Sequence, residues 1–379
     1  MITNKLQDIV HLLETFVVLL IIQPILFLLY GRACQNNRIN SSSVRGKIVI
    51  VTGASAGIGA EITRKLFISG GTVIMACRCA MKTLKLIESL KSEYPQALGS
   101  LHYIHLDLVN LSTVIQFIET FSNQFQSCDI LVNNAGINTP GPTQDGLERL
   151  FQVNYLGHYL LTLLLIKSTK LNHKKILRIV NFSSFTHHFG SIDYRLSASL
   201  QSPSTASPYS DSKLYMNLLT LQLNKLYSTL NNSINTNTIN NNKKSNIQSK
   251  KKAKKRPVST TNTTPSVLAV SVDPGAVNSE IWRDWTGIKR LGYKLVSGLF
   301  LSADEGSETA VYAATVDTEE LLSRYGAQYQ RPKTYRDYLY EKEPLLTGHA
   351  LIPYIIPYRF LFPSLAFEAV GVHTGRLSP

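Results

Sequence analysis

The chain has 379 residues, of which 44% are apolar, an ordinary share for a globular protein. This length fits two or three average domains, or one large α/β domain with extensions, and four cysteines without a CxxC pair (Cys34, Cys77, Cys79 and Cys128) exclude a disulfide framework. The net charge of +14 is concentrated: residues 231–264 hold eight Lys or Arg and no acid, which leaves +6 for the rest and excludes a fold that is basic throughout.

An apolar segment opens the chain. Residues 9–30 form a run of 22 residues that ends in TFVVLLIIQPILFLLY, and about 20 helical residues span the core of a bilayer. We therefore expect residues 1–43 to be a membrane anchor and linker, with a cleaved signal peptide and a buried helix as alternatives. Basic residues follow the segment and few precede it, which predicts a main domain facing the cytosol. We expect the membrane to be that of the endoplasmic reticulum.

From Lys47 onward, β-rich runs alternate with amphipathic stretches of helical length. We expect strands at 47–52, 71–77, 101–106, 129–134, 176–182 and 266–272, and helices near 58–69, 80–93, 110–126, 145–171 and 209–230. The strands are nearly continuous apolar runs, as expected for strands covered on both faces. The alternation predicts an α/β fold: a single Rossmann-fold domain, with a doubly wound parallel sheet, over residues 44–340.

Two segments depart from this pattern. Residues 231–265 are rich in Asn, Lys and Thr and lack apolar periodicity, so we expect a disordered surface insertion. A localisation signal and a contact for acidic lipid or RNA are alternatives for its lysines, but a solvated loop is the simpler interpretation, and we expect no nucleic-acid partner. Residues 341–379 form an apolar extension whose prolines argue against one continuous transmembrane helix. This extension would cover a substrate mouth, dip into a membrane interface or pack on the domain.

A glycine-rich turn follows the first expected strand. TGASAGIG, residues 52–59, stands between a strand and a helix. Glycines let backbone N–H groups approach a pyrophosphate, and the N-terminus of the helix favours the phosphate charge. The turn therefore predicts dinucleotide binding by Gly53, Ser55, Gly57, Ile58 and Gly59.

Further cofactor contacts are expected where the next strands end. Arg78 follows the second strand, in ACRC, and no acid lies within residues 71–81. An arginine there suits a ribose 2′-phosphate, whereas an acid would bind the 2′-hydroxyl, so we expect NADP(H) and leave NAD(H) open. The third strand is followed by Asp107, placed to reach the adenine, and the fourth is closed by NNAG, with Asn133, Ala135 and Gly136.

A tyrosine and a lysine lie four residues apart at the start of the last expected helix. Tyr209 and Lys213, in YSDSKLY, would share a helix face. An ammonium there can lower the pKa of a phenol from about 10, which makes the phenol usable as a proton donor or acceptor near neutral pH. The spacing alone is weak evidence, because Tyr-x-x-x-Lys also arises by chance on surface helices.

Taken in order, these segments resemble the short-chain dehydrogenase/reductase family. The family pattern is matched over about residues 44–340 by TGASAGIG, NNAG, Asn154 in FQVNYLGHYLLT, Ser184 in RIVNFSSFTHH, the Tyr209–Lys213 pair and VDPGAVNSEI. The resemblance implies a catalytic set of Asn154, Ser184, Tyr209 and Lys213, with Pro274 and Gly275 lining the nicotinamide.

The resemblance also implies a role for each catalytic residue. Tyr209 would exchange a proton with the reacting oxygen, and Ser184 would hydrogen-bond the same oxygen, with Ser183 as the adjacent alternative. Lys213 would bind the nicotinamide ribose and lower the pKa of Tyr209. Asn154 would hold a water of a proton relay that runs out from Lys213.

Within the family, ACR, VNYLGHYLLT and the long gap between Ser184 and Tyr209 resemble the retinol dehydrogenase-like branch, and VDPGAVNSEI its chromosome-X-like group. Relatives in this branch commonly carry an N-terminal membrane segment, and with Arg78 we expect a membrane-anchored, NADP(H)-preferring oxidoreductase; we expect no metal site. The oxidoreductase would interconvert a hydrophobic alcohol of retinoid, polyprenoid or sterol type with its aldehyde or ketone, and a homodimer is compatible with it. The insertion at 231–265 departs from typical members, and so does Asp273, where many relatives have His. Two alternatives remain: a non-catalytic nucleotide sensor or scaffold at a membrane, and a protein that acts through its lysine-rich loop.

Overall fold

The computed structural model describes residues 44–168, 176–192, 208–245, 267–282, 290, 293–294, 297–321 and 345–347. The predicted anchor at 9–30 lies outside these residues, as does nearly all of 341–379. Among the helices that are described, none is both long and apolar enough to cross a membrane.

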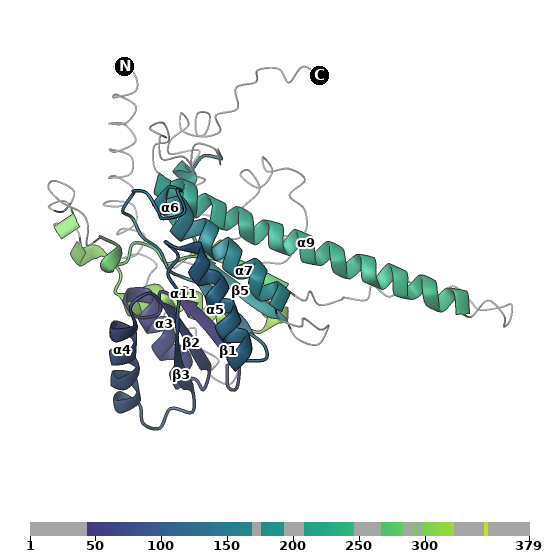
Figure 1. Cartoon of the computed structure of the whole chain (residues 1–379), viewed down its shortest axis with the longest axis horizontal. Coiled ribbons are helices and arrows are strands. Elements are labelled where there is room, and N and C mark those ends of the chain that lie inside the picture. The colour runs from purple at the N-terminus through teal and green to yellow at the C-terminus, as the bar shows by residue number, and fades with distance from the viewer. Residues whose placement is uncertain are drawn as a thin grey trace, which may run out of the picture.

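Seven parallel strands form one sheet in the order β3-β2-β1-β4-β5-β6-β7. Figure 1 labels four of them, β1, β2, β3 and β5. The strands are β1 Ile48–Thr52, β2 Thr72–Cys77, β3 Ser100–His105, β4 Ile130–Asn133, β5 Leu177–Phe182, β6 Val267–Asp273 and β7 Leu345–Thr347. The first six coincide with the expected strands, which confirms the single α/β domain. Because all neighbours pair in parallel, the strands end at one common border, here called the carboxyl edge.

Helices cover both faces of the sheet. One face packs against α3 (Gly57–Ile68), α4 (Ala80–Glu93) and α11 (Ala303–Thr315), and the core between them includes Val49 and Val51. The other face packs against α5 (Leu111–Gln124), α7 (Gly157–Ser168) and α9 (Pro208–Ser245), and that core includes Ile50. This division follows from the period of two along a strand. Shorter elements are α6 (Arg149–Phe151), a π-helix (Gln152–Leu156), 3₁₀ turns at Phe185–Phe189, Glu280–Trp282 and Ser297–Leu299, and α12 (Thr318–Leu321).

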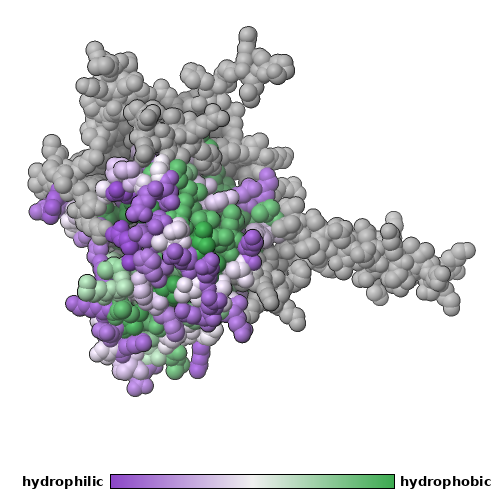
Figure 2. All heavy atoms as spheres, in the orientation of Figure 1, coloured by the Kyte–Doolittle hydropathy of each residue, from purple (hydrophilic) through white to green (hydrophobic). Residues whose placement is uncertain are grey.

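The outer surface of α7 is unusually apolar. Its sequence, GHYLLTLLLIKS, has hydrophobic side chains all around the helix. Figure 2 shows apolar atoms gathered over this helix between polar neighbours, and Tyr159 is 37% exposed there.

Three boundaries differ from the sequence expectation. The strand β7 pairs with the end of β6, so the sheet reaches into 341–379; a run of three residues is too short to give a strand pattern. The helix expected at 145–171 is interrupted by the π-helix. α9 continues to Ser245, so helix occupies the first part of the segment expected to be disordered, since extending a formed helix avoids the cost of nucleation. For 246–265, outside the described residues, disorder stays a prediction.

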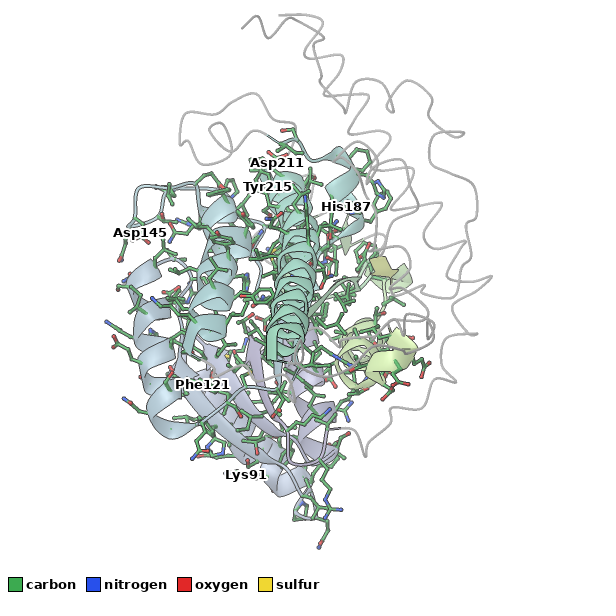
Figure 3. The ribbon with its side chains drawn as sticks, turned by 90° about the vertical axis from the view of Figure 1, so that its right-hand side faces the viewer. Lys91, Phe121, Asp145, His187, Asp211 and Tyr215 are labelled. Atoms are coloured by element: carbon green, nitrogen blue, oxygen red, sulfur yellow. The ribbon has the colours of Figure 1, made fainter. Side chains whose placement is uncertain are left out.

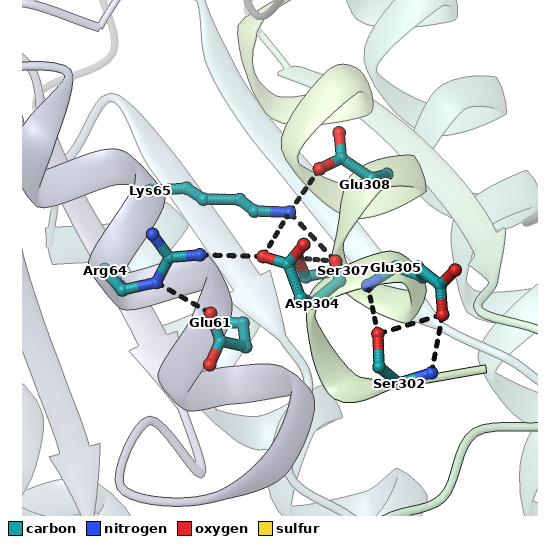
Figure 4. Close-up of polar contacts among 8 residues, drawn as sticks. All are labelled: Glu61, Arg64, Lys65, Ser302, Asp304, Glu305, Ser307 and Glu308. Atoms are coloured by element: carbon teal, nitrogen blue, oxygen red, sulfur yellow. Dashed lines mark hydrogen bonds and ion pairs between the residues drawn. The ribbon is translucent and has the colours of Figure 1, made fainter. Parts of the chain in front are cut away.

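Ion pairs fasten α11 to α3, the helix that starts at the glycine-rich turn (Figure 4). Lys65 Nζ donates to the Asp304 carbonyl at 2.8 Å, and Arg64 pairs with the Asp304 carboxylate at 2.7 Å. Ser302 and Glu305 form a reciprocal capping box at the start of α11. The turn is therefore supported by a helix that follows it in the chain by more than 200 residues.

Candidate active site

The residues expected to bind the cofactor and substrate follow the strands at the carboxyl edge. In spatial order they are Asp107 after β3, Arg78 after β2, Gly53 after β1, Gly136 after β4, Ser184 after β5 and Pro274 after β6. The strand order reverses between β1 and β4, and ligands of open α/β sheets bind outside the strand ends at such a switch point. Figure 3 shows Asp211, Tyr215 and His187, from α9 and the turn after Ser184, gathered at one end of the molecule, with Lys91 at the other.

The glycines of the glycine-rich turn lie where a side chain would be strained or would clash. Gly53 and Gly57 have φ of +66° and +51°, a region that favours glycine. A Cβ at Gly59 would lie 2.3 Å from the Gly53 carbonyl oxygen. The N-cap of α3 is Ala56, whose side chain makes no capping bond. The first N–H groups of α3 thus have no side-chain cap, and these features fit a bound pyrophosphate.

Thr52 joins this turn to the NNAG segment. Its Oγ1 accepts from the N–H groups of Asn134 and Ala135, both at 2.9 Å, and its carbonyl accepts from the Asn134 amide at 2.8 Å. Asn133 behaves differently from its neighbours: it is 1% exposed, and its amide donates to Asn181 and Thr162 inside the sheet–helix interface. The structure therefore does not bring the Asn133 side chain together with the other expected cofactor residues.

The side chains expected at the adenosine end lie in three different settings. Arg78 is exposed, just beyond β2. Asp107 is half-buried and accepts from the Val109 N–H at 3.1 Å, so its carboxylate shapes its own turn. Ser55 hydrogen-bonds the Cys77 thiol, and Ile58 packs against the core beneath α3.

The loop after β6 approaches the glycine-rich turn. Gly275 has φ +77°, and its N–H donates to Asp273 Oδ1 at 2.9 Å, which turns the chain directly after the strand. Further along the loop, the Ser279 side chain would lie 3.5 Å from a Cβ at Gly57. Pro274 and Gly275 are thereby held on the same side of the sheet as the turn.

Ser184, Tyr209 and Lys213 converge where β5 meets α9. The Ser184 hydroxyl lies close enough to the Tyr209 phenol to lower the pKa of the phenol by side-chain hydrogen bonding. Lys213 Nζ donates to the Phe182 carbonyl at 3.1 Å and lies 5.6 Å from the centre of the Tyr209 ring. The Ser183 hydroxyl instead donates to the Lys213 carbonyl at 3.1 Å, so of the adjacent pair it is Ser184 that contacts the phenol.

Asn154 lies in the π-helix, behind this group. The π-helix is marked by an i+5 bond from the Gly157 N–H to the Gln152 carbonyl; such bulges often accompany functional sites. The Asn154 amide exchanges two hydrogen bonds with the backbone of Ile137, at 2.9 and 3.0 Å. A Cβ at Gly136 would lie 3.6 Å from Asn154 Oδ1 and 3.5 Å from Lys213 Nζ, so Gly136 borders both.

The pKa values of Tyr209 and Lys213 differ from the sequence expectation. Desolvation, together with the charge of Asp273, raises the pKa of Tyr209, while the hydrogen bond from Ser184 lowers it. Lys213 is not among the causes, so the expected depression of the phenol pKa is wrong for the protein alone. Burial lowers the pKa of Lys213 to about 8, against an attraction from Asp273 that raises it. The lysine is therefore neutral at the alkaline pH at which the phenol ionises.

Three further residues belong to this site, and sequence reasoning did not assign them. Asp273 is 6% exposed and acts electrostatically on both Tyr209 and Lys213. His158 and Ser212 are buried and contact Asn154. The only sequence signal for His158 was its position four residues after Asn154, and the only one for Ser212 was its position next to Lys213. Such spacings are common on helices.

The chain is similar in sequence and fold to known dehydrogenases. The model of the family described as short chain dehydrogenase matches residues 47–255. Mouse polyprenol dehydrogenase is 30% identical over 80% of this chain and 79% of its own, and mouse retinol dehydrogenase 12 is 30% identical over 79% and 82%. The solved structure of an E. coli oxidoreductase, at 14% identity and a TM-score of 0.51, covers 83% of this chain and 98% of its own and shares the fold.

The match to the family model spans more than half of the chain, and the relatives align over most of their own length. The chain belongs to the short-chain dehydrogenase/reductase family, and it is an oxidoreductase that acts on CH–OH groups with a nicotinamide dinucleotide.

Proposed function

We propose that this protein is a membrane-anchored, NADP(H)-preferring dehydrogenase/reductase that interconverts a hydrophobic alcohol with its aldehyde or ketone. The substrate class is supported by the names of the relatives, which are polyprenol and retinol dehydrogenases. A retinoid, a polyprenoid and a sterol all fit this proposal. The observation that carries the chemistry is the convergence of Ser184, whose hydroxyl lowers the pKa of the Tyr209 phenol, and Lys213, whose Nζ lies 5.6 Å from the centre of the Tyr209 ring.

The reaction needs a proton source beside a polarised oxygen. When bound, the nicotinamide supplies or accepts the hydride. In reduction, Tyr209 donates its phenol proton to the carbonyl oxygen, which Ser184 polarises by donating a hydrogen bond to it. The raised pKa of Tyr209 keeps the phenol protonated at neutral pH, as a donor must be. In oxidation the same phenol, once deprotonated, takes the proton of the alcohol.

Lys213 and Asn154 complete the proposed proton path. Lys213 binds the nicotinamide ribose, and its pKa of about 8 leaves it mostly protonated at neutral pH. Asn154 holds a water that returns protons toward Lys213. Gly136, bordering both side chains, leaves space between them.

The cofactor preference rests on Arg78. This exposed guanidinium follows β2 directly, and no acid lies within residues 71–81 to bind a free 2′-hydroxyl. An arginine there pairs with the 2′-phosphate of NADP(H).

The location rests on the sequence of the chain ends. Residues 9–30 would anchor the protein in the endoplasmic reticulum membrane with its catalytic domain in the cytosol, and the apolar residues of 341–379 would lie near a lipid-dissolved substrate. The chromosome-X-like resemblance and a homodimer stay predictions.

The proposal is tested on the full chain in detergent micelles, with retinal and a polyprenoid aldehyde as probes. Wild type should oxidise NADPH, Tyr209→Phe should lose at least a thousandfold in kcat, and Tyr227→Phe, the same change further along α9, should behave as wild type. A Tyr209→Phe enzyme with wild-type kcat contradicts the mechanism. NADPH binding without turnover of any probe would favour a nucleotide sensor.

A cofactor titration tests the preference separately. Arg78→Ala should weaken NADPH binding at least tenfold and leave NADH binding unchanged, whereas Lys85→Ala, which removes an exposed charge from the neighbouring helix, should change neither. Equal treatment of both nucleotides by wild type and Arg78→Ala would reject the assignment.

A further inference from the structure

A chain of hydrogen bonds runs from the glycine-rich turn to the catalytic helix. Thr52 Oγ1 lies 2.9 Å from His158 Nε2, and His158 Nδ1 lies 3.1 Å from the Asn154 carbonyl oxygen. The Asn154 amide donates to Ser212 Oγ at 3.1 Å, and Ser212 donates to the Tyr209 carbonyl at 2.7 Å. Thr52, His158, Asn154 and Ser212 are each at most 1% exposed. These hydrogen bonds thus link the glycine-rich turn to Tyr209.

The histidine can make both contacts in only one tautomer. The Asn154 carbonyl only accepts, so Nδ1 must donate to it. Burial, helped by the nearby charge of Lys213, lowers the pKa of His158 to about 4, so the ring is neutral and Nε2 accepts. The Thr52 hydroxyl then donates to Nε2 at 2.9 Å, in preference to the Val132 carbonyl at 3.4 Å.

The two hydrogen-bond partners of His158 differ in whether another group can take the place of the imidazole. Thr52 still holds the two N–H groups of the NNAG segment and has the Val132 carbonyl as a substitute acceptor. Asn154 stands between the histidine and the catalytic helix, which it reaches through Ser212. Loss of the imidazole should therefore disturb the placement of Asn154 and Tyr209 more than the glycine-rich turn.

We propose that His158 is a positioning residue. It holds Asn154 between the glycine-rich turn and α9, and so fixes the position of Tyr209 relative to the nicotinamide. This inference rests on the proposed function. A histidine that merely fills the core would affect stability, whereas a positioning histidine affects kcat per folded enzyme and leaves the affinity for the nucleotide nearly unchanged.

The variant His158→Phe, made in the full chain, distinguishes a positioning role from a role in core packing. The affinity for NADPH is measured by nucleotide fluorescence, kcat is measured with retinal per nucleotide-binding site, and melting temperature is measured in parallel. We expect kcat to fall at least tenfold and the Kd of NADPH to change less than threefold. The control, Leu161→Val, thins the core on the same helix and should lower melting temperature without changing kcat. A wild-type kcat in His158→Phe overturns the proposal.

Ser212→Ala tests the other end of the same chain. If both residues act through Asn154, the double variant should be at most threefold slower than the slower single variant, while a fully multiplicative loss would overturn the linkage. If His158→Phe does not fold, His158→Asn and His158→Gln replace it: each amide mimics one ring nitrogen and breaks the other contact, so both should lower kcat at least threefold. Wild-type rates in both would overturn the proposal.

Tyr209→Phe is assayed alongside these variants. If Tyr209→Phe keeps its activity, the proposed function fails whatever the histidine variants do. If Tyr209→Phe is inactive and the His158 variants are fully active, the histidine inference alone fails.

Discussion

A buried lysine should make the stability of this protein depend on alkaline pH. Lys213 is 4% exposed, and burial lowers its pKa from 10.5 to about 8. Between these two values the unfolded chain holds a proton that the folded protein has lost, so the free energy of unfolding rises with pH in that window. Below pH 8 the full penalty for the buried charge is present, about 3 kcal/mol at about 1.36 kcal/mol per pH unit.

The magnitude follows from the same two pKa values. Between pH 7 and pH 9.5, linkage gives a gain of about 2 kcal/mol from Lys213. Cys77 and Cys128 act in the opposite sense, because burial raises the pKa of both thiols and the unfolded chain loses their protons first. The contribution of Lys213 is therefore a difference between wild type and Lys213→Met, in which the cysteine contributions cancel.

The assay is thermal and urea unfolding of both proteins without nucleotide, from pH 7 to pH 9.5. The stability of wild type relative to Lys213→Met should rise by about 2 kcal/mol across this range, which corresponds to about 4 °C in melting temperature for a domain of this size. Parallel curves for the two proteins would mean that the lysine has an ordinary pKa, and the account of its burial would be refuted.

Three other substitutions test the frame around the site. Gly59→Ala should abolish NADPH binding, because its Cβ would lie 2.3 Å from a backbone oxygen, whereas Gly298→Ala, with no atom within 4 Å, should bind normally; nucleotide fluorescence measures both. Arg178→Met should lose about 2–3 kcal/mol in urea unfolding, because this buried guanidinium holds the last carbonyls of α11, and unchanged stability would contradict that. Ser302→Ala should cost about 1 kcal/mol by loss of its capping box, in the same assay, and no loss would show the cap to be dispensable.

Local patterns were enough to predict much of the fold. Continuous apolar runs placed six strands, since a strand covered on both faces needs apolar residues on both sides. The glycine-rich turn could be read in the same way, because a positive φ at Gly53 or a missing Cβ at Gly59 is a local demand. The strand β7 and the extension of α9 to Ser245 could not, because the pairing of three residues and the growth of a helix depend on what is already folded beside them.

The sequence by itself determined which residues stand at the strand ends, and the parallel sheet then placed those ends at one edge. Only the tertiary structure decided which partner each side chain contacts. Ser184 contacts the Tyr209 phenol, whereas Ser183 donates to a carbonyl of α9 and the Asn133 amide donates to a buried side chain. It also decided the charges. Burial and Asp273 set the pKa values of Tyr209 and Lys213, and a pKa depends on the surroundings of a group in space, which a spacing along the chain does not fix.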